Sequence, residues 1–367
     1  MNRLQRLYAE CGQSPWLDNL RRGWITGGQL AALRDRGVRG LTSNPTIFQK
    51  AIQGSSDYDE QFSALTRSNV APRDAYWSLV LRDIDSALDV FAPIYETSGG
   101  EDGFVSVEVD PTLAHDSVGT LTSARDLHQR VDRPNVMIKI PATREGLPAI
   151  RTMIAEGRSV NVTLIFSLER YAEVLEAYVA GLEDFARSTS ASLSGVSSVG
   201  SFFISRVDTE VDRRLEALGS TDAMHLRGKA AVAQGQLAYR MFTQKFQGAR
   251  WNALAARGAR VQRPLWASTS TKNPSYRDTL YVEELIGPHT VNTLPDATLE
   301  AFDDHGVVAR RVDLDVAAAE HTWQAIGAAG VDHGAVAEQL EREGVSSFQK
   351  SFDELLTALT AKAAELG

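Results

Sequence analysis

Lys139 is the residue whose type and setting say most about chemistry, because it lies inside the apolar run at residues 136–141. Only seven of the chain's 38 basic residues are lysines. Burial disfavours the charged form of an amine, and a neutral amine attacks carbonyl groups to form a Schiff base. Arginine cannot do this, since a guanidinium group remains protonated. The alternatives are that Lys139 reaches from the strand end to water or pairs with Glu108.

Two carboxylates are candidates for proton transfer. Glu108 lies between apolar neighbours at residues 105–109, and Asp18 ends the short segment that begins at Trp16. Carboxyl groups in different environments can divide the roles of general acid and general base. For Glu108 the alternative is a structural ion pair with Lys139. Asp110 precedes a proline, and we interpret it as a turn residue.

Polar side chains recur where other apolar runs end. Asn44 precedes Pro45, which keeps the asparagine backbone extended, so its amide either binds substrate hydroxyls or shapes the turn. Asn161 and Thr163 are two residues apart and therefore point to the same side of a strand. Together with Ser201 they suit a shared polar pocket, although the same spacing occurs in ordinary hydrogen bonding between strands.

Two segments could bind phosphate. Arg206 follows the apolar run at residues 202–204, and residues 268–273 provide hydroxyl groups, backbone N–H donors and the cation Lys272. Loops after the late strands of a (β/α)8 barrel commonly bind phosphate. For the run that begins at Ser268 the alternative is the capped start of a helix.

Short apolar runs alternate with longer amphipathic stretches along the chain, which indicates an α/β protein. The expected strands are residues 16–19, 38–43, 104–109, 136–141, 160–165, 196–204, 264–268 and 290–293. The expected helices are residues 26–36, 72–91, 168–186, 208–218 and 226–246, with another that starts at 299–302. Parallel strands need long connections, so this order predicts helical crossovers between parallel strands.

About eight strand–helix units favour a (β/α)8 TIM barrel, in which the carboxyl ends of the strands form the active site. The candidate residues would then converge on one pocket. A doubly wound sheet is the runner-up, but the chain lacks the GxGxxG loop typical of that fold. We expect a single domain over residues 1–367, with additional C-terminal helices from about residue 314 packed on the barrel exterior or over its mouth.

Composition narrows the class of protein. The net charge of −9 argues against a nucleic-acid partner, because phosphate backbones attract basic proteins. Cys11 is the only cysteine and cannot form an intramolecular disulfide. No apolar run has the length of a membrane span or a signal peptide. We therefore expect a cytoplasmic protein with no membrane or nucleic-acid partner. The sequence has no zinc-type metal cluster, and we expect no cofactor.

Together these segments resemble the transaldolases, and they resemble the longer bacterial subfamily most. The matching runs follow the family's order and cover roughly residues 14–300. They are residues 16–18 (WLD), 40–46 (GLTSNPT), 105–110 (VSVEVD), 137–143 (MIKIPAT), 161–167 (NVTLIFS), 201–206 (SFFISR) and 266–269 (WAST).

The resemblance implies membership of the class I Schiff-base aldolase superfamily. Transaldolases transfer a dihydroxyacetone unit from sedoheptulose 7-phosphate to glyceraldehyde 3-phosphate, giving erythrose 4-phosphate and fructose 6-phosphate in the pentose phosphate pathway. Carried over, Lys139 would form the Schiff base and Asp18 would take the C4 hydroxyl proton. Glu108 would assist proton transfer through a water positioned by Thr163. The substrate-binding residues would be Asn44, Asn161, Ser201, Phe203, Arg206 and Ser268.

One segment departs from the family. Many members have an aromatic residue and an arginine after the pair that matches Ala267 and Ser268, whereas this chain continues to Lys272 without either. Lys272 would then be the second phosphate-binding cation. A Schiff-base aldolase that releases dihydroxyacetone and an inactive barrel that only binds ligands are the alternatives. We expect sugar phosphates as small-molecule partners, and a monomer or a homodimer.

Overall fold

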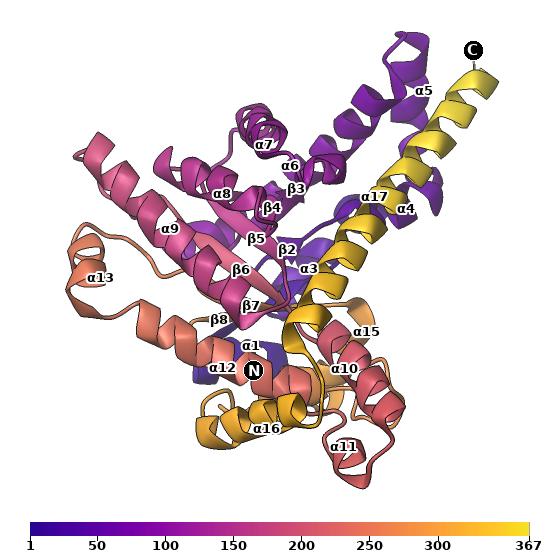
Figure 1. The fold of residues 1–367 in the computed structure, drawn as a ribbon. Helices are drawn as coiled ribbons and strands as arrows, with labels where there is room; N and C mark the ends of the chain where they lie inside the picture. Colours follow the sequence, from indigo (N-terminus) through magenta and orange to yellow (C-terminus); the bar gives the residue numbers. More distant parts are fainter. Residues whose placement is uncertain (367) are drawn as a thin grey trace.

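Residues 1–366 are described by the computed structural model, in which eight parallel strands close into a barrel in chain order (Figure 1). The strands are β1 (Gln13–Leu17), β2 (Leu41–Thr42), β3 (Val105–Glu108), β4 (Val136–Pro141), β5 (Val160–Ile165), β6 (Ser198–Phe203), β7 (Arg263–Ala267) and β8 (Thr290–Leu294). Because β8 pairs with β1, the sheet has no free edge. The (β/α)8 prediction is confirmed, and the doubly wound alternative was wrong.

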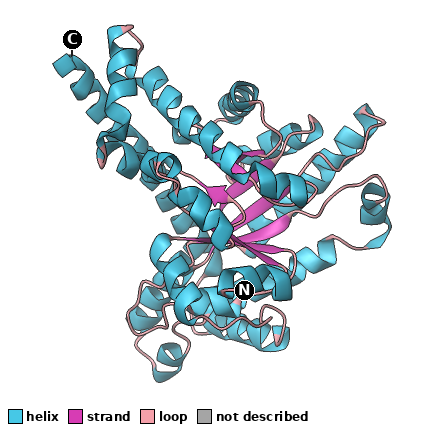
Figure 2. Ribbon diagram, turned by 180° about the vertical axis from the view of Figure 1, so that it is seen from behind, coloured by secondary structure: helices cyan, strands magenta, loops and turns pink. Residues whose placement is uncertain are grey.

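Helices enclose the strands (Figure 2). The helices before β5 are α1 (Arg3–Cys11), α2 (Arg22–Thr26), α3 (Gln29–Arg36), α4 (Pro45–Gln53), η1 (Ser56–Tyr58), α5 (Asp59–Arg67), α6 (Pro72–Thr97), η2 (Pro111–Leu113), α7 (Ser117–Val131) and α8 (Gly146–Ala155). The later helices are α9 (Leu168–Ser188), α10 (Ser205–Leu218), α11 (Thr221–His225), α12 (Ala230–Lys245), α13 (Gly248–Ala255), α14 (Leu280–Glu284), α15 (Asp296–His305), α16 (Val316–Ala328) and α17 (His333–Leu366).

The predicted ranges of β4 and β5 agree with the structure, and the other strands differ by a few residues at their ends. The helix expected at residues 26–36 begins only at Gln29, as α3. Gly27 and Gly28 separate it from α2, which ends at Thr26, and Gly28 has φ of 79°. The helix expected to end at residue 91 continues to Thr97 and includes Pro93. The helix expected from residue 226 begins only at Ala230.

The strand register places three predicted site residues in one row. Lys139 is the partner of Glu108 on β3 and of Asn161 on β5. Beyond this row the pairing of β5 with β6 is irregular, and Leu164 has a left-handed backbone with φ of 60°. Such bulges bend a strand locally and often lie beside active sites. Here the bulge brings Leu164 against α17, where a Cβ added to Gly344 would lie 2.9 Å from Leu164 Cδ2.

The amino-terminal end of the barrel is closed by polar contacts around Asp102, which is 1% exposed. Its carboxylate accepts hydrogen bonds from Trp16 Nε1 at 2.7 Å, from Arg39 Nε at 2.8 Å and from the Ser14 hydroxyl. Arg263 Nη2 lies 3.5 Å from the same carboxylate. A buried carboxylate needs such partners, and this network fixes the floor of the barrel, below the row that contains Lys139.

The two C-terminal helices take different positions. The sequence predicted packing either on the barrel exterior or over its mouth, and each of these placements holds for one helix. Helix α16 packs against α12 on the outside of the barrel. Helix α17, the long yellow helix in Figure 1, packs against α4, α6 and α10 and contacts β5. Its residue Phe348 lies over Lys139, with the amine 5.7 Å from the ring centroid. Helix α17 therefore covers part of the barrel mouth.

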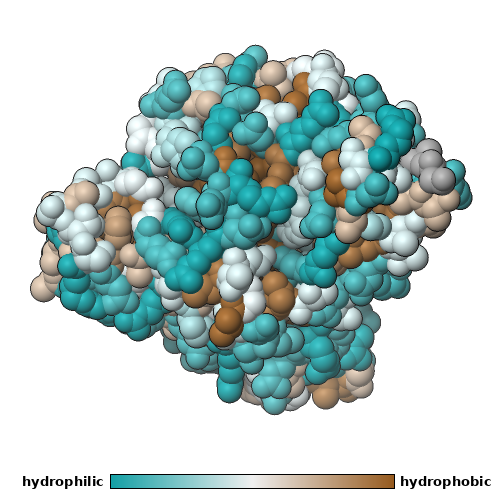
Figure 3. Space-filling model, turned by 90° about the horizontal axis from the view of Figure 1, so that it is seen from above, coloured by the Kyte–Doolittle hydropathy of each residue, from teal (hydrophilic) through white to brown (hydrophobic). Residues whose placement is uncertain are grey.

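The surface seen in Figure 3 is mostly hydrophilic, and hydrophobic residues show in separate small areas between polar ones. Within residues 1–366, no helix is both long enough and apolar enough to cross a membrane.

Candidate active site

A cavity of about 330 Å³ opens at the carboxyl ends of the strands, where the sequence predicted the site. It brings together residues that are distant in the chain but follow different strands. The predicted residues that line it are Asp18, Asn44, Lys139, Thr163, Ser201, Phe203, Arg206, Ser268 and Lys272. Glu108 and Asn161 do not line the cavity, because they lie behind the residues that do.

Lys139 lies at the base of this cavity and is 4% exposed. Its Nζ lies 3.0 Å from Glu108 Oε2 and donates a hydrogen bond to the Ser43 carbonyl oxygen at 3.2 Å. The interpretation in which the Lys139 side chain extends to the solvent outside the protein is therefore wrong, and the ion pair with Glu108 is confirmed. The pair does not exclude chemistry, since the amine still faces the cavity where a carbonyl group could approach it.

Glu108 is placed to hold a proton beside this amine. Burial raises the pKa of Glu108, although the neighbouring positive charge of Lys139 opposes the shift. The negative charge of Asp18 adds to the rise in the pKa. Glu108 Oε2 receives no well-aligned hydrogen bond within the described residues, despite its short distance to Lys139. A carboxyl group with a raised pKa next to an amine is suited to acid–base catalysis near neutral pH.

Asp18 follows β1 and lies at the side of the cavity. Burial raises the pKa of Asp18, while the charge of Lys139 and the hydrogen bond from Thr42 oppose this shift. Thr42 Oγ1 donates to Asp18 Oδ1 at 2.9 Å and lies 2.6 Å from Thr293 Oγ1. These hydroxyls fix the carboxylate, and its second oxygen makes no hydrogen bond with another side chain in residues 1–366. Asp18 is thus available as a base to a molecule in the cavity.

Asn161 connects the strands behind the cavity. Its Nδ2 donates to Ser106 Oγ at 3.0 Å, and its Oδ1 accepts from Ser201 Oγ at 2.7 Å. Asn161 therefore makes ordinary hydrogen bonds between strands. One of these bonds also orients Ser201, which lines the cavity. Thr163, on the same strand, faces the cavity, and its buried hydroxyl has no hydrogen-bond partner among the described residues. A buried hydroxyl without a partner is costly, so a water or a substrate group would be favoured there.

Asn44 shapes the turn, as one of the two interpretations of the sequence expected, and it also lies at the cavity. Its Oδ1 accepts a hydrogen bond from the Ile47 backbone N–H at 2.9 Å and caps α4, so it shapes the turn before Pro45. Its side chain also lines the cavity. Asp110 is the turn residue that was predicted, because its side chain caps η2 by accepting from Thr112 N.

Cations gather at the outer part of the cavity. Arg206 is in the first turn of α10 and lies over the Phe203 ring, 5.2 Å from its centroid. Burial lowers the pKa of Arg206 and of Lys272. Ser268 has a left-handed backbone with φ of 55°, and its hydroxyl oxygen lies 2.9 Å from that of Ser205. The run from Ser268 is a loop and not a helix start, since the next helix begins at Leu280.

Several lining residues were not predicted from the sequence. They are Thr42, Thr46, Ile47, Lys50, Ala267, Thr293, Pro295, Ser347 and Phe348, whereas Ser270 lies in the predicted phosphate-binding segment. The scarcity of lysines could have pointed to Lys50, and the position of Thr293 at the end of an expected strand was a further signal. Ser347 and Phe348 gave no local signal, because they reach the cavity only through the packing of α17.

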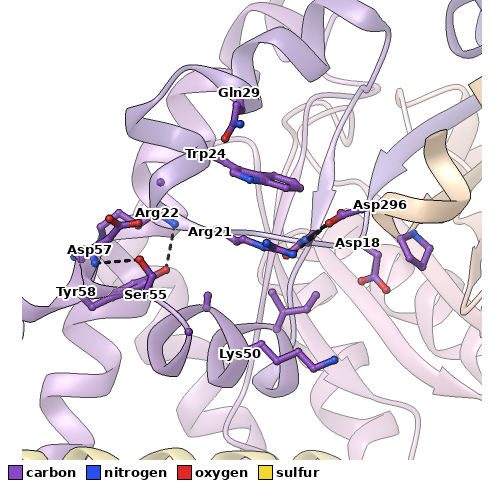
Figure 4. Close-up of a pocket in the computed structure, with 16 residues that line it drawn as sticks. Asp18, Arg21, Arg22, Trp24, Gln29, Lys50, Ser55, Asp57, Tyr58 and Asp296 are labelled. Carbon is purple, nitrogen blue, oxygen red and sulfur yellow. Dashed lines mark hydrogen bonds and ion pairs between the residues drawn. The ribbon is translucent and has the colours of Figure 1, made fainter.

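A second cavity of about 620 Å³ adjoins the first and is shown in Figure 4. The two cavities share Asp18, Ile47, Lys50 and Pro295. In the second cavity Arg21 lies under Trp24, with the guanidinium 4.9 Å from the ring centroid, and its Nη2 is 3.3 Å from Asp296 Oδ2. Residues 1–366 contain no group of three or more His, Cys, Asp or Glu side chains that could hold a metal ion.

A closed parallel barrel with a buried lysine and two carboxylates at the carboxyl ends of its strands is typical of the class I aldolases. The chain belongs to the transaldolase/fructose-6-phosphate aldolase family, whose model matches residues 15–359. The resemblance noted in the sequence is thereby confirmed over most of the chain.

Three relatives show how far the similarity extends. The chain is 52% identical over 359 residues to "Transaldolase 1" of Streptomyces coelicolor, covering 97% of this chain and 94% of that protein. It is 52% identical over 350 residues to the transaldolase of Saccharopolyspora erythraea, covering 95% and 94%. It is 50% identical over 365 residues to the transaldolase of Thermobifida fusca, covering 98% of each. The chain is therefore an enzyme of the transaldolase type.

Proposed function

We propose that the enzyme transfers a dihydroxyacetone unit from sedoheptulose 7-phosphate to glyceraldehyde 3-phosphate through a Schiff base on Lys139. The products are erythrose 4-phosphate and fructose 6-phosphate, and the reaction belongs to the pentose phosphate pathway. The observation that carries this proposal is the buried amine of Lys139, 3.0 Å from Glu108 Oε2 in a cavity that Asp18 also lines.

The first step is formation of the imine. The neutral amine of Lys139 attacks the C2 carbonyl of the ketose, and the carbinolamine then loses water to give a protonated imine. Glu108 supplies the proton that converts the leaving hydroxyl to water and later takes a proton back. Its raised pKa supports this exchange. The free hydroxyl of Thr163 supports the placement of a water between Glu108 and the reacting atoms.

Cleavage of the carbon chain follows. Asp18 takes the proton of the C4 hydroxyl, the C3–C4 bond breaks, and its electron pair passes into the protonated imine to give an enamine. The aldose phosphate leaves with a new C4 aldehyde. An acceptor aldose then reacts with the enamine, Asp18 returns the proton to the new hydroxyl, and hydrolysis of the imine frees Lys139. No metal is needed, because the imine itself accepts the electron pair.

The other predicted residues would bind the substrate. Asn44 and Ser201 are positioned to contact the hydroxyls of the dihydroxyacetone unit, and Asn161 would act on them through Ser201. Phe203 would provide an apolar side of the pocket. The phosphate group would be bound by Arg206, Ser268 and Lys272 at the outer end of the cavity. Phe348 of α17 would help to exclude water from the enamine, which would otherwise be protonated before the acceptor arrives.

An aldolase that releases dihydroxyacetone is the second candidate, since the matching family model includes fructose-6-phosphate aldolases. It would use the same lysine. A coupled assay with fructose 6-phosphate, run with and without erythrose 4-phosphate, distinguishes the two. A transaldolase consumes the ketose only when the acceptor is present. Release of glyceraldehyde 3-phosphate and free dihydroxyacetone at the same rate without an acceptor would contradict the proposal.

We also propose that the chain folds as one domain in the cytoplasm, binds no cofactor, and is a monomer or a homodimer. The contacts of α17 with helices from both halves of the chain support one folding unit. Light scattering coupled to gel filtration gives the oligomeric state. Activity that is lost on dialysis against EDTA and restored by a divalent ion would contradict the cofactor-free reaction.

A further inference from the structure

Besides Lys139, which pairs with Glu108, three cations line the mouth cavity, and only two of them were candidates for phosphate binding. They come from three different elements: Lys50 from α4, Arg206 from α10 and Lys272 from the loop after β7. Within residues 1–366 none of the three has a carboxylate within ion-pair distance, whereas many other arginines of the chain are paired. Lys272 donates to Ser270 Oγ at 2.5 Å, and Arg206 lies over Phe203. The positive charge at the mouth is therefore left without a partner.

The position of Lys50 follows from the helix that carries it. Thr46, Ile47 and Lys50 are spaced to lie on one face of α4, and all three line the cavity. Contacts with α17 hold α4 in place: Gln49 Nε2 donates to Glu354 at 2.7 Å, and the Thr46 hydroxyl lies 2.8 Å from that of Ser351. Figure 4 shows the Lys50 side chain extended toward Asp18, at the boundary of the two cavities.

The charges around the cavity leave an excess that fits one anion. Lys50 and Arg206 both repel Lys272, and Asp18 is the acidic side chain that offsets them. Glu343 also faces Arg206, but it is exposed on α17 and largely solvated. Lys139 and Glu108 form an ion pair and add no net charge. The other three positive charges and the Asp18 carboxylate leave two positive charges. A phosphate monoester carries about two negative charges near neutral pH. With Arg206 and Lys272 alone, the same sum would leave one charge of the phosphate unmatched.

We propose that Lys50 is a third phosphate-binding cation, which with Arg206 and Lys272 makes the enzyme specific for sugar phosphates over unphosphorylated sugars. This proposal rests on the proposed function, because it places the phosphate end of the substrate at the mouth of the cavity. Lys50 adds a charge to those of Arg206 and Lys272, which were the two cations expected from the sequence. It acts on binding and not on the bond-breaking steps, since it lies where the two cavities meet, whereas Lys139 lines only the first cavity.

The test compares Lys50→Met and Lys50→Arg with the wild-type enzyme. Methionine keeps the apolar length of the side chain and removes its charge, so α4 can fold unchanged. Lys50 is exposed and partly screened by solvent, so the expected rise in KM for fructose 6-phosphate is about three- to tenfold. The kcat should stay within about twofold, and Lys50→Arg should remain close to wild type. On unphosphorylated fructose kcat/KM should be the same for all three proteins within about twofold. Lys350→Met is the matched control, because Lys350 is on α17 with its side chain 75% exposed.

Two measurements separate failure of this proposal from failure of the proposed function. Isothermal titration with inorganic phosphate reports the cation cluster without any turnover, and Lys50→Met should bind phosphate about three- to tenfold more weakly. Borohydride reduction of the wild type with fructose 6-phosphate reports the Schiff base alone. Phosphate affinity and KM unchanged by Lys50→Met would overturn the role of Lys50 while the proposed function stands. An equal loss on phosphorylated and unphosphorylated donors would also overturn it, because Lys50 would then support α4.

Discussion

Glu108 and Lys139 are register partners on β3 and β4, and their side chains form a buried ion pair in which Glu108 Oε2 is 3.0 Å from Lys139 Nζ. The barrel thus delivers an amine and a proton carrier to the same point from adjacent strands. Asp18 reaches the same cavity from the end of β1, which β2 separates from the strand of Glu108 and which β2 and β3 separate from the strand of Lys139. In the proposed mechanism this separation allows one carboxyl group to act at the imine and the other at the C4 hydroxyl.

Reduction with borohydride in the presence of fructose 6-phosphate should leave one stable adduct on Lys139 and inactivate the enzyme. The buried amine beside Glu108 is the reason. Peptide mass spectrometry locates the adduct. Lys50 and Lys272 line the same cavity and serve as internal controls, so an adduct on either of them would contradict the assignment. Lys139→Arg should give no adduct, because a guanidinium is not nucleophilic at neutral pH.

Asp18→Asn should lower kcat by about 10²–10⁴-fold, since a neutral amide cannot accept the C4 hydroxyl proton. Imine formation should persist, so borohydride trapping should still label Lys139. Asp57→Asn is the matched control, because Asp57 lines only the adjoining cavity. Near-normal turnover by Asp18→Asn would show that another carboxylate, Glu108 first, is the base.

Arg206→Ala should raise KM for phosphorylated donors by about ten- to a hundredfold, because one charge-assisted contact with phosphate contributes roughly 1.5–3 kcal/mol. Lys272→Ala should have a smaller effect in the same direction, since Lys272 is more exposed than Arg206. Arg213→Ala is the control, because Arg213 is on the same helix but pairs with Glu210. Steady-state kinetics with fructose 6-phosphate and with fructose measure this difference. An equal loss of kcat/KM on both donors would show that Arg206 supports the fold and does not bind the phosphate.

Gly344→Val should lower activity by displacing α17 from the barrel mouth. A Cβ at this position would lie 2.9 Å from Leu164 Cδ2, and the Leu164 side chain is 1% exposed, so it has little room to move. The expected result is a loss of kcat/KM of about tenfold or more, comparable to other overpacked contacts that cost about 1–3 kcal/mol. Glu338→Val is the control on an exposed position of the same helix. Full activity of Gly344→Val would show that the position of α17 does not matter for catalysis.

Asp208 gives a prediction about stability and pH. Burial raises the pKa of Asp208 to about 6, although its carboxylate accepts hydrogen bonds from Ala231 N and from the Tyr281 hydroxyl. Between about pH 4 and about pH 6 the folded state retains a proton that the unfolded state releases, so the free energy of unfolding falls as the pH rises. A shift of this size corresponds to on the order of 3 kcal/mol.

Asp208→Asn removes this titration. Relative to wild type, the variant should therefore gain stability as the pH rises from about 4 to about 7. Urea unfolding at both ends of that range measures the difference, and Asp126→Asn, at an exposed position of α7, is the control. A difference between variant and wild type that does not change with pH would contradict the raised pKa of Asp208.

The sequence by itself determined the barrel and most of its site. The apolar runs that became β4 and β5 were found with their boundaries, because residues buried on both faces of a parallel strand are apolar in succession. Lys139, Asp18 and Arg206 were found because parallel strands bring their carboxyl ends to one side, so a polar residue at a strand end has a predictable direction.

The tertiary structure decided what depends on contacts between distant segments. Lys50 and Phe348 reach the cavity only because α4 and α17 pack together, and no local pattern encodes that packing. The break between α2 and α3 and the bulge at Leu164 were missed for a related reason. Helix and strand periodicity describe a regular backbone and register neither the Gly27–Gly28 pair, whose freedom at positive φ allows the break, nor a left-handed residue such as Leu164, which its neighbours in space must hold. The residue types in the sequence therefore determine which reactions are chemically possible. The packing of helices over the barrel mouth determines which side chains reach the cavity.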